Sequence, residues 1–267
     1  MKLTLLRLFW IRHASVVLVM GTLFAAFQFM LCTIVAKANL GGVLEALAGT
    51  LPPFFQELIS SQISGGLSER GLLAFGWNHP VSHALGAAVA IVLAARAVAG
   101  EIETGAIELL LSQPMTRISY FLMRVVFACM ALAFVSFMGV AGTLAGQALY
   151  GLDLFPAARL LRLGFQYFLL QVTWFAVVVA FSAYGSEGGR IALVGFLLAL
   201  VSYFVQVISG LWPDAAFLAP WTLHHYFSPH QILLAETSQT WAGFTLLTLS
   251  LLGLGVAVAM FRRRDLP

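Results

Sequence analysis

Six apolar stretches of the sequence are long enough to cross a lipid bilayer as helices, and this feature most constrains the fold. They run roughly over residues 14–36, 81–99, 118–148, 164–184, 191–211 and 241–261. A hydrocarbon core about 30 Å thick is crossed by about 20 helical residues. Hydrophobic residues make up 61% of the 267 residues and charged residues only 9%, so a soluble fold would expose large apolar patches. The sequence therefore predicts an all-α membrane protein with six transmembrane helices, in one transmembrane domain over residues 1–267.

The basic residues predict the orientation, because Lys and Arg concentrate on the cytoplasmic side of membranes. With both termini inside, ten of the fourteen basic residues lie inside and four lie outside. The inside set is Lys2, Arg7, Arg12, Arg96, Arg117, Arg124, Arg190, Arg262, Arg263 and Arg264, and the outside set is Lys37, Arg70, Arg159 and Arg162. We therefore expect a multi-pass protein of the cell inner (plasma) membrane with cytoplasmic termini and outer loops over 37–80 and 212–240.

Shorter apolar segments flank the first span. The N-terminal sequence KLTLLRLFWIRH predicts an interfacial helix that leads into this span, and the apolar run continues to Ala36 without a cleavage site, so we expect it to be retained. In the first outer loop, VLEALAG and PPFFQELI are too short to span and are typical of interfacial or re-entrant helices.

The segment EIETGAIELLLSQPMTRISY, residues 101–120, carries three of the eleven acidic residues between two apolar stretches. Wound as a helix, it places Ile102, Ala106, Leu109 and Leu110 on one face and Glu101, Thr104, Glu108 and Ser112 on the opposite face. Pro114 ends this helix, and Thr116 can cap the next one. The pattern predicts a short amphipathic helix over about 101–113, with its acidic face exposed to the cytoplasm. An ordinary interfacial linker would have the same pattern.

The same segment resembles the permease subunits of type 2 ABC exporters, most of all those related to the bacitracin-resistance and nitrous-oxide-reductase maturation exporters. The matching residues are Glu101, Glu103, Gly105, Glu108, Leu109, Leu110, Leu111, Ser112, Pro114 and Arg117. Ala106 stands where many members have Thr, whereas LAPWTLHHYFSPHQIL before the last span is similar to the outer loop of many members. The resemblance implies that 101–113 is a coupling helix seated on an ATPase, with Glu101, Glu103, Gly105, Glu108, Leu111, Ser112, Pro114 and Arg117 as the coupling residues.

Nucleotide binding within this chain is not expected. Lys2 and Lys37 are its only lysines, and neither follows a glycine-rich phosphate-binding loop. We therefore expect no enzymatic activity and no cofactor in this chain, with ATP and Mg on the partner ATPase. No basic stripe with interleaved aromatic residues indicates nucleic-acid binding.

Several other polar residues lie in or near the spans. Arg96, near the cytoplasmic end of its span, is predicted to anchor the coupling helix by pairing with Glu101 or Glu103. Five histidines fall on the predicted outer side, namely His79, His83, His224, His225 and His230. A metal or proton role is one interpretation, but no carboxylate or cysteine stands at ligand spacing, so we expect interfacial histidines and no metal. Cys32 and Cys129 are expected to be core residues.

These features favour the transmembrane subunit of an ATP-driven exporter of an amphipathic or lipid-like substrate or drug. Its partners would be a cytoplasmic ABC ATPase and a second permease chain, identical or closely related, with Gly139, Gly142 and Gly146 allowing close helix approach. The alternative is a non-transporting membrane scaffold or sensor that docks a cytoplasmic partner. An ion-coupled carrier is less favoured, because no carboxylate lies in the middle of any span.

Overall fold

The computed structural model describes residues 2–37, 52, 68–107, 115–234 and 240–264, and these ranges contain helices and no strand. The long helices are α1 (Lys2–Lys37), α4 (Glu69–Asn78), α5 (Pro80–Ala97), α8 (Arg117–Tyr150), α9 (Ala157–Tyr184), α10 (Gly188–Leu211) and α12 (Thr240–Arg263). The short ones are α6 (Ala99–Glu103), η1 (Pro213–Trp221), η2 (Leu223–Tyr226) and α11 (Pro229–Leu233). Counting α4 and α5 together, six helices among the described residues are long and apolar enough to cross a membrane, as predicted. The chain is a helical, multi-pass membrane protein.

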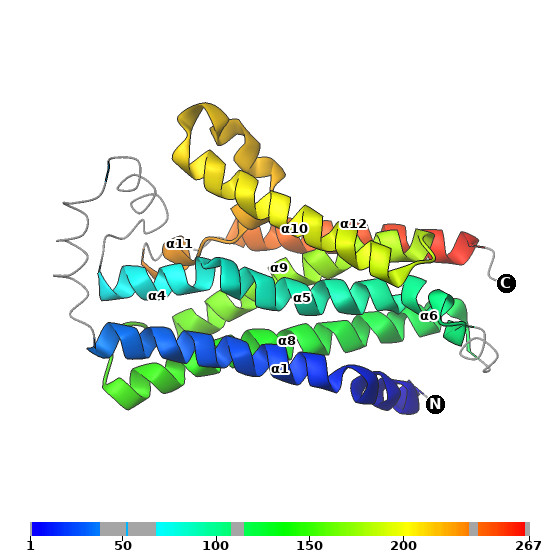
Figure 1. The fold of residues 1–267 in the computed structure, drawn as a ribbon, viewed down its shortest axis with the longest axis horizontal. Helices are drawn as coiled ribbons and strands as arrows, with labels where there is room; N and C mark the ends of the chain where they lie inside the picture. The colour runs from blue at the N-terminus through cyan, green and yellow to red at the C-terminus, as the bar shows by residue number, and fades with distance from the viewer. Residues whose placement is uncertain (1, 38–51, 53–67, 108–114, 235–239, 265–267) are drawn as a thin grey trace.

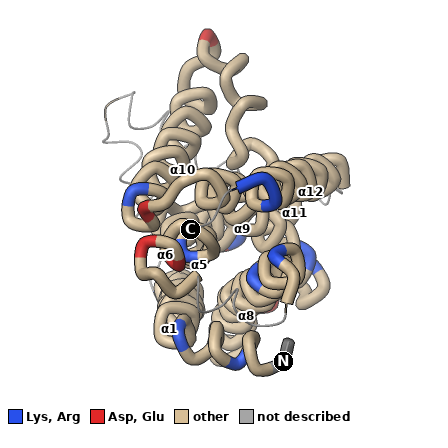
Figure 2. Tube along the Cα trace, turned by 90° about the vertical axis from the view of Figure 1, so that its right-hand side faces the viewer, with Lys and Arg blue, Asp and Glu red and all other residues tan. Residues whose placement is uncertain are grey.

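Successive spans run in opposite directions, so the bundle has two distinct ends (Figure 1). Both termini and α6 lie at one end, which we call the terminal end, and α4 and α11 lie at the other, the far end. Nine of the ten basic residues predicted to lie inside belong to the terminal half of their helices, Arg264 follows the terminal end of α12, and the other four belong to the far end. Figure 2 looks onto the terminal end and shows basic residues around its rim, with acidic residues at α6.

The second span begins earlier than the sequence predicted. Residues 69–78, placed in the outer loop by the sequence, form α4 and pack into the bundle with buried Leu73 and Trp77. The extended backbone of His79 and the ring of Pro80 break the helix between α4 and α5. Ser82 Oγ donates to the carbonyl oxygen of Gly76 over 2.6 Å across this break. Residues 69–78 therefore belong to the helical bundle and not to the predicted loop 37–80.

The first span and the N-terminal segment form one continuous helix. α1 has 36 residues, which corresponds to a length of about 54 Å at 1.5 Å per residue. Its ends therefore extend beyond a hydrocarbon core of about 30 Å. The interfacial position of its first turns stays a prediction. VLEALAG, and PPFFQELI apart from Pro52, lie outside the described residues.

A row of glycines on α8 packs against α1 within the same chain. A Cβ atom at Gly142 would lie 2.7 Å from the Cα of Ala25, and one at Gly146 would lie 2.8 Å from Cys32 Sγ. Gly139 is similarly close to the ring of Phe24. The expectation that these glycines serve contact with a second chain is therefore wrong, because α1 already occupies their surface.

α9 lies at the centre of the bundle and contacts α5, α8, α10 and α12. Its buried side chains include Tyr167 and Phe175, and Thr173 Oγ1 lies 2.9 Å from Ser250 Oγ on α12. α10 lies at the periphery, with large apolar side chains such as Leu200 and Phe204 more than half exposed. η1 folds back along α10 within the predicted loop 212–240 (Figure 1).

Candidate functional site

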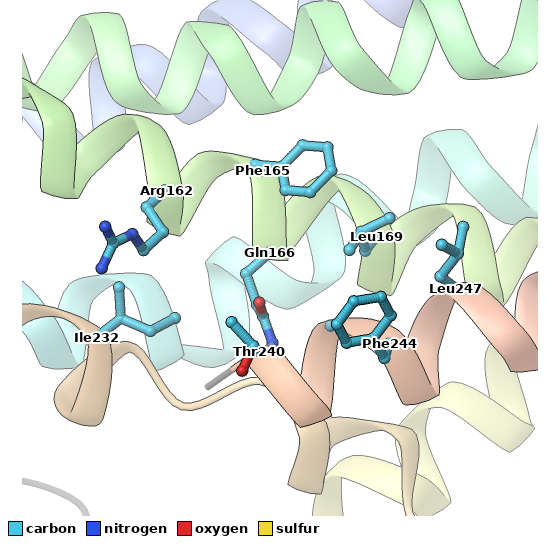
Figure 3. Close-up of a pocket in the computed structure, with 9 residues that line it drawn as sticks. Arg162, Phe165, Gln166, Leu169, Ile232, Thr240, Phe244 and Leu247 are labelled. Atoms are coloured by element: carbon cyan, nitrogen blue, oxygen red, sulfur yellow. The ribbon is translucent and has the colours of Figure 1, made fainter. Parts of the chain in front are cut away.

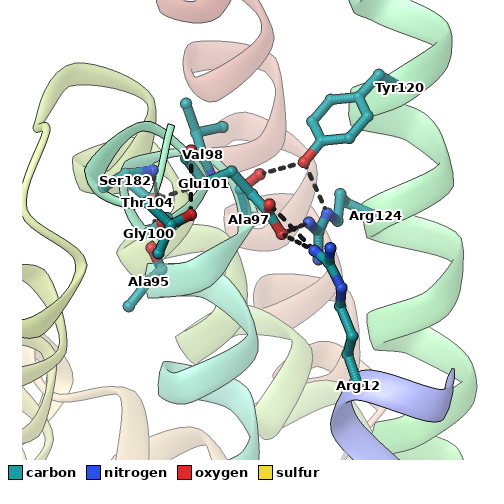
Figure 4. Close-up of polar contacts among 11 residues, drawn as sticks. Arg12, Ala95, Ala97, Val98, Gly100, Glu101, Thr104, Tyr120, Arg124 and Ser182 are labelled. Carbon is teal, nitrogen blue, oxygen red and sulfur yellow. Dashed lines mark hydrogen bonds and ion pairs between the residues drawn. The ribbon is translucent and has the colours of Figure 1, made fainter. Parts of the chain in front are cut away.

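The turn between α5 and α6 is held by Ser182 of α9. The backbone nitrogens of Val98 and Ala99 donate to Ser182 Oγ over 3.3 and 3.0 Å, and this hydroxyl donates to the carbonyl oxygen of Ala95 over 3.0 Å. These contacts supply partners for backbone groups that the ends of two helices leave free. Ser182 thereby fixes the direction in which α6 leaves the bundle (Figure 4).

Glu101 on α6 lies between two arginines. Its carboxylate accepts hydrogen bonds from Arg124 Nη2 on α8 and from Arg12 Nη1 on α1, the latter at 3.2 Å to Oε2. The side chains of Glu101 and Arg124 are only 7% and 3% exposed, whereas that of Arg12 is 43% exposed. This one carboxylate therefore joins the start of the 101–117 segment to two spanning helices (Figure 4).

Aromatic residues hold the Arg124 guanidinium in place. Arg124 Nε donates to the hydroxyl of Tyr120 over 2.9 Å, and this hydroxyl donates to the carbonyl oxygen of Ala97 over 3.1 Å. The guanidinium carbon lies 3.9 Å from the ring centroid of Phe9, which is a cation–π contact. The buried charge is thus paired, hydrogen-bonded and stacked, as a charge within a membrane protein requires.

Glu103 connects α6 to the first turn of α10. Its Oε2 accepts a hydrogen bond of 2.7 Å from the backbone nitrogen of Gly188. A carboxylate is favourable at a helix N-terminus, where free N–H groups and the helix dipole attract negative charge. The two helices approach so closely that a Cβ at Gly188 would lie 2.9 Å from the Cα of Gly100.

The predicted helix over 101–113 is interrupted. α6 ends at Glu103, and Gly105 has a φ of 70°, a left-handed conformation that suits glycine. Glu101 was expected on the face exposed to the cytoplasm, but it is buried, whereas Glu103 and Thr104 are exposed. Periodicity failed here because the helix is too short and the two arginines attract the carboxylate inward. Glu108, Leu111, Ser112 and Pro114 lie outside the described residues.

The end of the segment follows the prediction more closely. Thr116 Oγ1 accepts from the backbone nitrogen of Ser119 over 3.1 Å, which confirms that Thr116 caps the next helix. Arg117 Nη1 donates to the carbonyl oxygen of Arg264 over 2.7 Å. Arg264 in turn donates to the carbonyl oxygens of Ala183 and Gly185 at 3.0 and 2.6 Å. Arg117 is therefore tied to the C-terminal segment and to the turn between α9 and α10.

A cleft of about 790 Å³ opens at the terminal end beside α6, between α1, α5 and α10. Its charged lining residues are Arg12, Arg96, Glu101 and Glu103, and its apolar lining includes Val92 and Ala192. Arg96 is exposed in this cleft, and the ion pairs of Glu101 are with Arg12 and Arg124 instead. The predicted pairing of Arg96 with Glu101 is therefore wrong.

The far end brings together two of the five histidines. The rings of His83 and His224 lie 4.7 Å apart between centroids, and His224 Nδ1 lies 2.9 Å from Ser202 Oγ. Burial lowers the pKa of His224 to about 3. His79 caps α5, while His225 and His230 line a polar pocket of about 290 Å³ together with His224. No group of three or more potential metal ligands occurs among the described residues.

Sequence reasoning missed the residues that hold Glu101 and the α5–α6 turn. Arg124 was predicted only as one of the basic residues of the cytoplasmic side. Its position inside a membrane helix was the available signal, because an ionisable residue there needs a polar or charged partner. Arg12 and Ser182 lie 89 and 83 residues from the groups they bind, Glu101 and Ala99, so local pattern carried no signal for them.

Comparison with known proteins found no family model that matches this chain. A search of curated proteins likewise found no match.

Proposed function

We propose that this chain is the transmembrane permease subunit of an ATP-driven exporter, energised by a separate ATPase that docks on residues 101–117. The observation that carries the proposal is the pairing of the buried Glu101 with Arg124 and Arg12. It fastens the base of the proposed docking segment to α8 and α1. The hydrogen bonds to Ser182 and Gly188 fasten the same base to α9 and α10. A force applied to the segment would thus be passed to four spanning helices.

The geometry supports a division of labour within the segment. Glu101 is buried and serves transmission, whereas Glu103 and Thr104 are exposed where a soluble partner can reach them. The remaining coupling residues proposed from the sequence are Glu108, Leu111, Ser112 and Pro114. Arg117 braces the other end of the segment against the C-terminal residues.

The cleft supports the proposed substrate class. Arg12 and Arg96 line it together with the apolar side chains of Val92 and Ala192. A cleft with both charged and apolar lining suits an amphipathic substrate that enters from the terminal end. We further propose that a second permease chain packs along α10, whose large apolar side chains lie exposed at the periphery of the bundle.

Charge reversal at the proposed docking surface tests this function. The permease would be co-expressed with a lone ATPase domain encoded by a neighbouring gene. The double variant Glu108→Arg, Leu111→Arg should insert normally but lose both co-purification with the ATPase and stimulated ATP hydrolysis, because it adds repulsion and removes contacts. Asp214→Arg, a charge reversal at an exposed far-end residue, is the control and should couple normally.

The outcomes also separate the rival functions. Coupling at wild-type rates in the double variant would contradict the proposed docking surface. A scaffold or sensor would bind its partner without ATP-dependent transport into vesicles, and an ion-coupled carrier would transport without any ATPase. A panel of amphipathic drugs and lipids in vesicle uptake assays addresses the substrate.

Cysteine labelling of intact cells tests the orientation. Gly189 and Asp214 are exposed at opposite ends of the bundle, and a Cβ at Gly189 would meet no atom within 4 Å. In a chain with Cys32 and Cys129 replaced by alanine, Asp214→Cys should react with an impermeant maleimide and Gly189→Cys should not. Labelling of Gly189→Cys alone would contradict cytoplasmic termini, and equal labelling of both would contradict the six-span arrangement.

A further inference from the structure

A groove of about 390 Å³ lies between α9 and α12 near the far end (Figure 3), and its apolar residues Phe165 and Phe244 are more than half exposed on the outside of the bundle. Phe165 and Leu169 of α9 form one wall, and Phe244 and Leu247 of α12 form the other. The groove is separate from the cleft at the terminal end and shares no residue with it.

Polarity changes along the groove. Its far-end mouth carries Arg162, Gln166 and Thr240, and the side chains further along are those of Leu169, Phe244 and Leu247 (Figure 3). Seven residues separate Arg162 from Leu169, which corresponds to about 10 Å along the helix. A cationic mouth about 10 Å from apolar side chains matches the boundary between the headgroups and the acyl chains of a bilayer.

Gln166 adds a fixed polar group beneath the arginine. The residue is only 7% exposed, and its Nε2 donates to the carbonyl oxygen of Tyr226 over 3.0 Å. The amide oxygen faces Gly243 in the opposite wall, since a Cβ on this glycine would lie 3.4 Å from Oε1. That oxygen can accept a hydrogen bond from a hydroxyl group held at the mouth.

We propose that this groove binds an anionic phospholipid, with its phosphate on Arg162 and one acyl chain between Phe165 and Phe244. Charge complementarity selects the occupant, because Arg162 is exposed at the mouth and no carboxylate is among the described residues that line the groove. A guanidinium binds phosphate through paired hydrogen bonds, more strongly than it binds a neutral group. The lipid would bridge α9 and α12 and stabilise their contact.

Two matched pairs of variants test the two halves of the site. Gly243→Leu should fill the groove, whereas Gly255→Leu on the same helix has nothing within 4 Å of its Cβ and leaves the groove open. Arg162→Gln removes the charge at the mouth, whereas Arg70→Gln removes an exposed far-end charge outside the groove.

The purified full-length chain in detergent would be titrated with phosphatidylglycerol or phosphatidylcholine, and bound lipid would be counted by native mass spectrometry. We expect the wild type, Arg70→Gln and Gly255→Leu to prefer phosphatidylglycerol by about fivefold. Arg162→Gln should lose that preference, and Gly243→Leu should bind both lipids about fivefold more weakly.

An unchanged preference in Arg162→Gln, or equal binding by the two glycine variants, would overturn the proposal. If Gly243→Leu fails to fold, the arginine pair decides the outcome. Each of these results is independent of ATPase coupling.

Discussion

Arg124 on α8 donates to Glu101 on α6, and the side chains of both residues are less than a tenth exposed. Removing two such charges from water is costly, and their mutual attraction offsets that cost only when the geometry and the surrounding hydrogen bonds are good. The structure supplies these through Tyr120, Phe9 and Arg12. The pair is therefore sensitive to the loss of either partner.

Glu101→Gln should destabilise the chain strongly, because it leaves the buried guanidinium of Arg124 without its counter-charge. The expected loss of unfolding free energy is about 3–5 kcal/mol. Glu103→Gln, at an exposed carboxylate, should cost under about 1 kcal/mol. Thermal unfolding in detergent measures both. In a double-mutant cycle, adding Arg124→Gln to Glu101→Gln should recover stability. Equal costs for Glu101→Gln and Glu103→Gln would contradict the buried pairing.

Ser182→Ala should loosen the turn between α5 and α6. It deprives the buried nitrogens of Val98 and Ala99 of their acceptor, and an unsatisfied buried group costs about 1–3 kcal/mol. The control is Ser209→Ala, because Ser209 Oγ donates to the carbonyl oxygen of Val205 within its own helix. Hydrogen exchange at residues 98–103 should rise in Ser182→Ala alone, and equal exchange in the two variants would refute the role of Ser182.

Gly142→Ala should separate α8 from α1. The added methyl group would overlap the backbone of Ala25, which cannot move without displacing α1, and overpacking of this kind costs about 1–3 kcal/mol. Gly255→Ala has open space around its Cβ and should be neutral or slightly stabilising, since alanine favours the helix by about 1 kcal/mol. The melting temperature should therefore fall in Gly142→Ala and stay the same or rise in Gly255→Ala.

His224 should make stability depend on pH. Its pKa is about 3 in the folded chain against an ordinary value of 6.5, so the unfolded chain binds more protons between these values. Stability is then fully present above about pH 6.5 and falls as the pH drops toward 3, by up to about 1.4 kcal/mol per pH unit. His224→Asn should reduce this slope in unfolding measured from pH 4 to 7, and His225→Asn should reduce it less. A slope unchanged in His224→Asn would exclude this histidine as the source.

The spans were predictable because hydropathy is a local property of the sequence. Thr116 as a cap was equally local, since its partner Ser119 is three residues away. The burial of Glu101 was not predictable in this way, because it depends on Arg12 and Arg124, which lie 89 and 23 residues away on other helices.

Short elements and interhelical contacts were the other sources of error. The five-residue α6 ends before the left-handed Gly105, so a periodicity extended to residue 113 placed Glu101 on the wrong face. Gly142 was recognised as a site of close helix approach, but the sequence did not indicate whether the approaching helix was α1 or another chain.

The pairing of Gln28 with the break between α4 and α5 bears on how the chain is assembled during synthesis. Gln28 Nε2 donates to Gly76 and Ser82, each over 3.3 Å, and these partners lie 48 and 54 residues further along the chain. A ribosome that adds about 5–20 residues per second makes Ser82 roughly 3–11 s after Gln28. α1 therefore enters the membrane with an amide that lacks these partners, and we expect the translocon to retain it until the second span emerges and the two leave as a hairpin.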